Sequence, residues 1–160
     1  MSETAVASPA LSGTKFFMNF PVTPTSHLLG EYRARGGYEA LAKALRDMQP
    51  ADVTKEVAAA GLLGHGGAAF PAGRKWGVVK LTDGQPHYVC MNADEGEPGT
   101  FKDRWLLEHV PHMCLEGLII GSYALMGRHA FIYIRGEFDL SHTRMAEATL
   151  EVPVGRDSVR

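Results

Sequence analysis

Two short apolar runs restrict the fold of this chain most strongly: HYVCM at residues 87–91 and AFIYI at residues 130–134. Each run has the length and composition of a buried β-strand. Between them, Pro111 begins an apolar segment that ends at Gly127, which predicts a helix. A strand, a helix and a second strand with so long a connection predict a right-handed parallel crossover. We therefore expect an α/β layered fold of the Rossmann-like kind, with ligands bound where its parallel strands end.

Helices are predicted on both sides of this unit. Residues 37–48 and residues 50–60 show helical spacing, and a short helix is expected from Pro71 to Val79. Residues 142–150 could form a last short helix, although few of their side chains are large and apolar. The first helix places Tyr38, Leu41, Leu45 and Met48 on one face, which is expected to pack in the core or against a partner helix. In the helix after Pro111, the side chains expected to point toward the sheet are Leu115, Leu118, Ile119 and Tyr123.

The composition is that of one ordinary globular domain. The chain has 160 residues and a formal net charge of −2, which argues against a general nucleic-acid-binding surface. The N-terminus lacks the basic and apolar regions of a secretory signal, and the longest apolar stretch is too short and too interrupted to span a membrane. We therefore expect a cytoplasmic protein without a transmembrane segment. The two cysteines, Cys90 and Cys114, follow no metal-binding spacing, so no metal site is predicted.

The segment GLLGHGGAAFPAGRKW, residues 61–76, contains five glycines in 16 residues. Glycine lets a backbone approach a ligand closely, and a glycine-rich turn that leads into a helix collects free N–H groups that suit a phosphate. Lys75 would lie about one helical turn further on, from where its ammonium group could reach the same anion. The segment matches neither the Walker A motif nor the GxGxxG fingerprint. A loop that only turns the chain is therefore an alternative interpretation.

A second polar segment, NADEGEPGTFKDR at residues 92–104, follows the first predicted strand and is expected to be a loop. Its Asp94, Glu95 and Glu97, beside Asn92, could bind a metal, transfer protons or accept hydrogen bonds from sugar hydroxyls. A solvated turn is the alternative. Together, the two segments suit a ligand with a phosphate at one end and hydroxyl groups beside it, such as FMN or another nucleotide.

The chain resembles the FMN- and NADH-binding flavoprotein subunit of NADH:quinone oxidoreductase (complex I) through GHGGAAFPAGRKW and NADEGEPGTFKDR, followed by PHMCLEGLIIGSYALMGRHAFIYIRGEF. The same family includes the diaphorase subunits of NAD-reducing hydrogenases and NAD-dependent formate dehydrogenases. The resemblance extends from His27 to Phe138. It implies a flexible leader at residues 1–26, the N-terminal part of a truncated FMN/NADH-binding domain at residues 27–138, and a divergent tail at residues 139–160.

The resemblance also implies which residues bind the cofactors. Phe70 would stack on the adenine of NADH, and Glu97 would lie near the bound nicotinamide nucleotide. The family usually has Arg, Gly and an aromatic residue where this chain has His65, Ala69 and Val78. No catalytic or metal-binding side chain is implied. The residues implied around FMN are Gly64, His65, Gly66, Gly67 and Lys75 at its phosphate and ribityl chain, with Asn92, Asp94 and Glu95 as further ligands.

The activity implied by the resemblance is that of an NADH dehydrogenase: hydride transfer from NADH to FMN, then electron transfer to iron–sulfur clusters of a larger redox complex. The implied partners are a thioredoxin-like [2Fe–2S] subunit and other subunits, which would hold the protein at the inner face of a membrane. Longer family members bind a [4Fe–4S] cluster, whereas this chain has only two cysteines and no such ligand set. The alternative is a truncated, non-catalytic fragment or paralogue that acts as a nucleotide-binding or interaction module.

Overall fold

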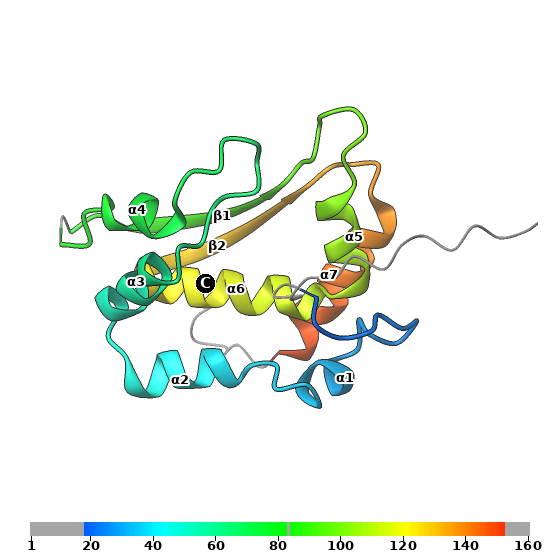
Figure 1. Cartoon of the computed structure of the whole chain (residues 1–160), viewed down its shortest axis with the longest axis horizontal. Coiled ribbons are helices and arrows are strands. Elements are labelled where there is room, and N and C mark those ends of the chain that lie inside the picture. The colour runs from blue at the N-terminus through cyan, green and yellow to red at the C-terminus, as the bar shows by residue number, and fades with distance from the viewer. Residues whose placement is uncertain (1–17, 83, 153–160) are drawn as a thin grey trace, which may run out of the picture.

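The computed structural model describes residues 18–82 and 84–152 (Figure 1). No helix in these two ranges is long and apolar enough to cross a bilayer. Along them the elements follow in the order α1 (Leu29–Arg33), α2 (Glu39–Asp47), α3 (Pro50–Ala59), α4 (Ala72–Gly77), β1 (His87–Ala93), α5 (Lys102–His109), α6 (Pro111–Ala124), β2 (Gly127–Ile134) and α7 (Asp139–Glu151).

The two strands lie side by side and run parallel, which confirms the predicted α/β arrangement. β1 is longer than predicted, because Asn92 and Ala93 continue the ladder opposite Tyr133 and Ile134. The loop predicted at residues 92–104 therefore starts later than expected, and it also ends earlier, because α5 begins at Lys102. The loop prediction is therefore wrong at both ends, and only residues 94–101 connect β1 to α5.

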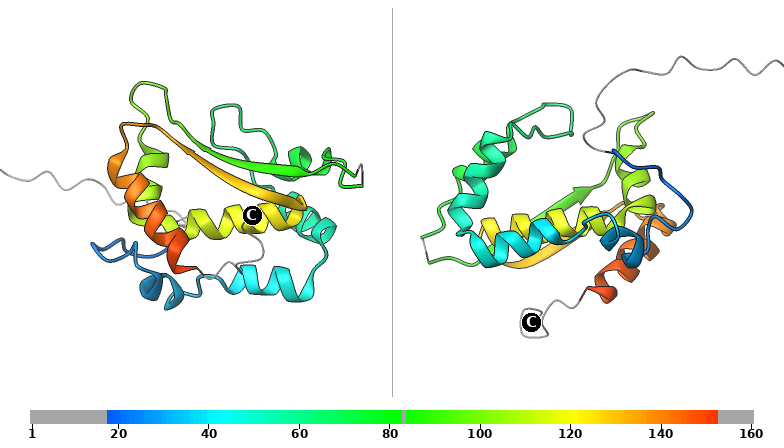
Figure 2. Two further views of the ribbon diagram at one scale, coloured as in Figure 1. Left: turned by 180° about the vertical axis from the view of Figure 1, so that it is seen from behind. Right: turned by 60° about the horizontal axis from the view of Figure 1, so that its bottom comes forward.

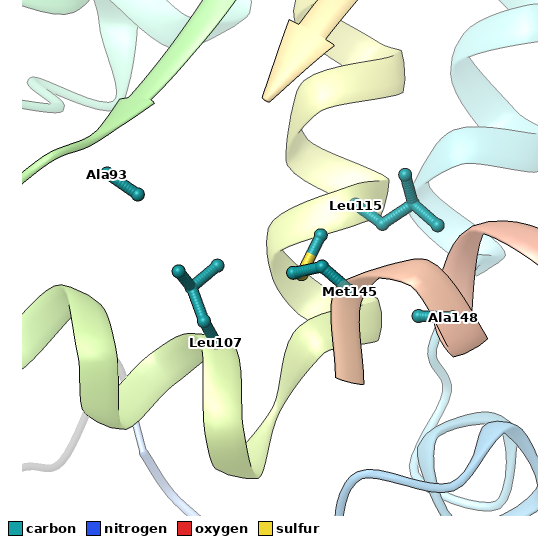
Figure 3. Close-up of a cluster of buried hydrophobic side chains, with 5 residues drawn as sticks. All are labelled: Ala93, Leu107, Leu115, Met145 and Ala148. Carbon is teal, nitrogen blue, oxygen red and sulfur yellow. The ribbon is translucent and has the colours of Figure 1, made fainter. Parts of the chain in front are cut away.

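α6 lies between the sheet and the N-terminal helices, as Figure 1 shows. On its sheet side, Leu115 packs into a cluster of buried side chains that consists of Ala93, Leu107, Leu115, Met145 and Ala148 (Figure 3). On its other side, the Tyr123 hydroxyl donates a hydrogen bond to the carbonyl oxygen of Met48 at 2.7 Å. The prediction that Tyr123 faces the sheet is therefore wrong. A helix that is covered on both sides is apolar nearly all round, so no single stripe identifies its sheet face.

α2 begins later than predicted and buries only part of the expected face. Tyr38 has a φ of 68°, in the left-handed region, and precedes the helix. Leu41 and Ala44 are buried, whereas Leu45 is 53% exposed. Leu45, expected on the face that packs in the core or against a partner helix, therefore lies outside the buried face of α2. The small Ala44 packs in a second buried cluster, together with Val53 of α3 and Ala124, the last residue of α6.

A buried carboxylate fixes the N-terminal helices on α6. Glu116 accepts hydrogen bonds from the Tyr32 hydroxyl at 2.5 Å, the Tyr38 N–H at 3.0 Å and the Leu41 N–H at 2.9 Å. These contacts satisfy amides at the start of α2, whose N-cap residue supplies no capping side chain. Burial, and then the hydrogen bond to Glu116, raise the pKa of Tyr32 far above its ordinary value, so its hydroxyl remains a donor.

α7 packs against α5 and α6 near the carboxyl ends of the strands (Figure 2). Met145 and Ala148 of this helix are each 2% exposed and belong to the core cluster. The helix predicted at residues 142–150 is thus confirmed and is longer at both ends. Part of the segment expected to be a divergent tail therefore contributes to the core. The remaining positions of the expected tail and leader, 153–160 and 1–17, lie outside the described residues.

The face of the sheet opposite α6 carries exposed aromatic side chains. Tyr88, Phe131 and Tyr133 are 61%, 56% and 57% exposed. Tyr88 stacks on His129 of the neighbouring strand, with ring centroids 5.7 Å apart. Parallel strands are usually covered on both faces, so an open aromatic face is a distinctive feature of this sheet.

Candidate functional site

A cavity of about 800 Å³ lies between the glycine loop that precedes α4 and the segment that follows β1. Its volume is in the range of small-molecule sites, about 300–1,000 Å³. Both polar segments singled out in the sequence contribute to its wall. The lining residues are His65, Gly66, Gly67, Asn92, Asp94, Glu95, Gly96, Glu97, Thr100, Lys102 and Asp103.

The base of the glycine loop is closed by backbone hydrogen bonds. The Gly64 N–H donates to the Phe70 carbonyl oxygen at 2.9 Å, and the Ala72 N–H donates to the Leu62 carbonyl oxygen at 2.8 Å. Gly73 then brings α4 against α3, because a Cβ atom at this position would lie 2.4 Å from the Cα atom of Ala58. Residues 65–69 therefore project as a loop from a fixed base.

The tip of this loop offers open backbone. A Cβ atom at Gly66 or Gly67 would meet nothing within 4 Å, and Gly67 has a φ of +95°. Ala69 also has a positive φ, 47°, which an L-residue adopts only with strain. Two adjacent glycines without a covering side chain let a ligand approach the main chain, as a phosphate-binding loop requires.

The opposite wall begins at the carboxyl end of β1. Asn92 lies in the strand, and its Oδ1 atom accepts a hydrogen bond from the Asp94 N–H at 3.1 Å. Asp94 and the exposed Glu97 line the cavity, and the Thr100 hydroxyl donates to the Glu97 carbonyl oxygen at 2.6 Å. Two carboxylates that border a cavity can accept hydrogen bonds from the hydroxyl groups of a sugar or a ribityl chain.

Glu95 differs from its acidic neighbours, because its side chain is only 1% exposed. The carboxylate accepts hydrogen bonds from the backbone N–H groups of Asp103 at 2.8 Å and Arg104 at 3.0 Å. Both N–H groups belong to the first turn of α5. The carboxylate predicted to bind FMN thus already has partners within the protein.

Three of the predicted site residues lie outside the cavity lining, namely Gly64, Phe70 and Lys75. Gly64 belongs to the closed base of the loop, and Lys75 lies on the last turn of α4. Phe70 is 48% exposed, with the Arg74 guanidinium 5.7 Å from its ring centroid. The other seven predicted residues line the same cavity: His65, Gly66, Gly67, Asn92, Asp94, Glu95 and Glu97.

Lys102 is a cavity residue that the sequence did not lead us to expect. It begins α5, its Nζ atom lies 3.8 Å from Glu95 and 2.6 Å from Asp103, and its side chain is 44% exposed. The signal was present in the sequence, because Lys102 belongs to the same NADEGEPGTFKDR segment. Among residues 18–82 and 84–152, no group of His, Cys, Asp and Glu side chains could hold a metal ion.

Glycine-rich backbone that faces polar side chains at the carboxyl end of a parallel strand is typical of α/β proteins that bind phosphorylated cofactors. The chain belongs to the Nuo51 FMN-binding domain family, whose model matches residues 57–156. This membership confirms the resemblance to complex I flavoproteins. The match includes α7 and so continues beyond Phe138, where the resemblance in the sequence ended.

Curated relatives are F subunits of NADH-quinone oxidoreductase. The chain is 48% identical to one such protein of Rhizobium meliloti over 80% of its own length and 30% of the relative. It is 45% identical to the Aquifex aeolicus protein with the same coverage, and 40% identical to the Escherichia coli protein over 77% of its length and 28% of the relative. The chain therefore spans about 30% of these relatives.

A solved structure gives an independent similarity. The air-oxidized NAD⁺-reducing [NiFe]-hydrogenase contains a chain with a TM-score of 0.60 and 37% sequence identity. The match covers 66% of this chain and 18% of the hydrogenase chain. The matching part of the hydrogenase chain therefore shares this α/β fold.

Proposed function

We propose that the cavity binds FMN and places it for reduction by NADH. One observation carries the proposal: the uncovered backbone of Gly66 and Gly67 faces Asp94 and Glu97 across the same cavity. FMN pairs a phosphate with a chain of hydroxyl groups. Amide N–H groups suit the phosphate, and carboxylates suit the hydroxyls.

The residues present fit this cofactor. Glycine at both loop positions leaves room for a ligand beside the main chain, and Lys102 supplies a cation among the lining residues. At the strand end, the Asn92 side chain is held by the hydrogen bond that its Oδ1 atom accepts from the Asp94 N–H. When bound, FMN supplies a hydride acceptor that can pass electrons on singly, while the protein binds and orients it.

The activity proposed for the whole protein follows from its family. We propose NADH oxidation within a larger redox complex, with electrons passed to iron–sulfur clusters, including that of a thioredoxin-like [2Fe–2S] subunit. A [4Fe–4S] cluster would need ligands besides Cys90 and Cys114, since those lie on the open face of β1 and on α6. The proposed location is the cytoplasm, at the inner face of a membrane through partner subunits.

Flavin fluorescence tests the binding proposal. FMN and riboflavin are titrated separately with the purified chain, because riboflavin lacks the phosphate. The proposal predicts saturable quenching of FMN fluorescence when the protein is added, and weaker binding of riboflavin. The Asp94→Asn variant should bind both flavins more weakly. No saturable quenching with either flavin would overturn it.

A matched pair of lysine variants locates the phosphate. Lys75→Ala removes the lysine that the family resemblance implies, and Lys102→Ala removes the one that lines the cavity. The variant at the phosphate should bring the affinity for FMN close to that for riboflavin, while the other should leave the difference intact. If both variants keep the wild-type difference, neither lysine binds the phosphate.

The second candidate function is a non-catalytic nucleotide-binding or interaction module. The open aromatic face formed by Tyr88, Phe131 and Tyr133 favours it, because such a face suits contact with another protein. Anaerobic addition of NADH to the chain with FMN bound separates the two candidates. Loss of the yellow flavin absorbance supports the NADH dehydrogenase, and unchanged absorbance supports the module.

A further inference from the structure

Glu95 is the one acidic residue of the cavity segment whose carboxylate is turned away from solvent. Its side chain is 1% exposed, although Gly96 and Glu97, which follow directly, are both exposed. A buried carboxylate is stable only when its oxygens have hydrogen-bond or charge partners. The partners of Glu95 therefore indicate what it does.

The hydrogen-bond partners are amides in the first turn of α5, and the Lys102 Nζ atom is a charge partner 3.8 Å from Oε1. Oε1 accepts from the Asp103 N–H at 2.8 Å, and Oε2 accepts from the Arg104 N–H at 3.0 Å. The first amides of a helix have no partner within the helix, and the N-cap residue Phe101 offers no capping side chain. Glu95 thus caps α5 from the opposite end of the connecting loop, where a negative charge also interacts favourably with the helix dipole.

The backbone of Glu95 is fixed in a sparsely populated conformation. Its φ is 47°, in the left-handed region, where a residue with a Cβ atom is strained. The guanidinium of Arg135, just after β2, donates a hydrogen bond to the Glu95 carbonyl oxygen at 3.4 Å. Side chain and main chain of Glu95 therefore hold the loop at α5 and at the end of β2. A strained residue that is held in this way often belongs to a functional site.

The flanking carboxylates depend on this fixed point. Asp94 and Glu97 line the cavity on either side of Glu95, and Lys102 enters the cavity from the capped turn of α5. The space beside Asp94 is narrow, because a Cβ atom at Gly96 would lie 3.1 Å from its Oδ2 atom. A change at residue 95 would therefore shift the groups that face the ligand.

We propose that Glu95 is a positioning residue, which caps α5 and thereby holds Asp94 and Glu97 toward the cofactor, and is not itself a cofactor ligand. This assignment rests on the proposed function, since it concerns the same cavity. It replaces the role of FMN ligand that the family resemblance implied for Glu95. The remaining acidic residues of the segment then make the contacts with the cofactor.

Amide hydrogen exchange and FMN affinity test the assignment together. Glu95→Gln keeps the side-chain shape but replaces one acceptor oxygen by a donor group. Exchange at the amides of Asp103 and Arg104 should accelerate, and so should exchange in loop residues 96–100. Glu97→Gln, the matched control two residues away, should leave exchange at Asp103 and Arg104 unchanged.

A double-mutant cycle separates positioning from direct contact. Glu95→Gln should weaken FMN binding about tenfold in the wild-type chain, because the loss acts through displaced groups. In the Asp94→Asn/Glu97→Gln background, it should change the affinity by less than about threefold, since coupled residues give non-additive effects. A full tenfold loss in that background, or a loss of affinity without faster exchange, would make Glu95 a direct ligand and overturn the assignment.

Two further outcomes are distinguishable. If Glu95→Gln only lowers the unfolding midpoint and leaves the FMN affinity of the folded protein unchanged, Glu95 has a purely structural role and the assignment is overturned. If the wild-type chain binds no FMN, the proposed function fails. In that case faster exchange in residues 96–100 still supports loop positioning, and unchanged exchange there contradicts it.

Discussion

Gly73 provides the sharpest test of how the glycine loop is held. A Cβ atom at this position would lie 2.4 Å from the Cα atom, 2.5 Å from the Cβ atom and 2.5 Å from the N atom of Ala58. Carbon atoms in ordinary contact are about 3.5–4.0 Å apart, so Gly73→Ala must separate α4 from α3 by roughly 1 Å. The clash involves backbone, which cannot rotate away as a long side chain can.

The expected cost follows from this overlap. Overpacking of a close contact typically costs about 1–3 kcal/mol, whereas glycine to alanine in a helix free of clashes gains up to about 1 kcal/mol. We therefore expect Gly73→Ala to lower the free energy of unfolding by about 1–2 kcal/mol. For a domain of this size, that corresponds to a fall in Tm of roughly 2–8 °C.

The control is Gly77→Ala at the end of the same helix. A Cβ atom at Gly77 would meet nothing within 4 Å, so this variant should be as stable as the wild type or slightly more stable. Urea denaturation followed by circular dichroism and by tryptophan fluorescence measures both variants. Equal or greater stability of Gly73→Ala would refute the argument that close packing at Gly73 positions the loop.

Three further predictions concern single residues. Ala69 has a φ of 47°, so Ala69→Gly should relieve about 1–2 kcal/mol of backbone strain, against a loss of about 0.4–1 kcal/mol from the greater entropy of the unfolded chain. Urea denaturation should show equal or slightly higher stability for this variant, and a clear loss of stability would contradict the strain at Ala69. Burial lowers the pKa of His112, which bonds Tyr38 and Glu151. The imidazole of His112 therefore binds a proton more readily in the unfolded chain than in the folded protein. The stability that depends on neutral His112 is complete above the pKa of this residue in the unfolded chain, and it is lost as the pH falls below that pKa. Between about pH 8 and about pH 5, the urea midpoint should fall less steeply for His112→Gln than for the wild type. Parallel curves would refute the claim that buried, neutral His112 causes the pH dependence. Burial raises the pKa of Cys114 to about 12, whereas Cys90 is exposed; a thiol reagent should modify only Cys90 in the native protein, and rapid labelling of Cys90→Ser would contradict this.

The parallel strands were predictable because each strand has a local signature. Apolar runs of strand length, separated by a helix with Pro at its start and Gly after its end, restrict the topology strongly. Which side chains of α6 face the sheet was less predictable. α6 contacts the sheet on one side and the N-terminal helices on the other, so the side on which Tyr123 lies depends on packing that no single helix encodes.

The site was predictable at the level of segments but not at the level of every side chain. The glycine-rich and acidic segments are recognisable by composition, and they do share a cavity. The orientation of Glu95 was not predictable, because it depends on a chain reversal that brings the amides of Asp103 and Arg104 back to it. Lys75 was predicted because it lies about one helical turn beyond the glycine loop, whereas Lys102 lines the cavity because α5 begins there.

The central claim is that the cavity between the glycine loop and the β1 end binds FMN. Titration of the isotope-labelled chain with FMN, followed by amide chemical shifts, tests it most directly. We expect saturable shifts at Gly66, Gly67, Asp94 and Gly96, with small shifts in α2 and on the open sheet face. Saturable shifts confined to other surfaces, or no shifts at these four amides at saturating FMN, would contradict it.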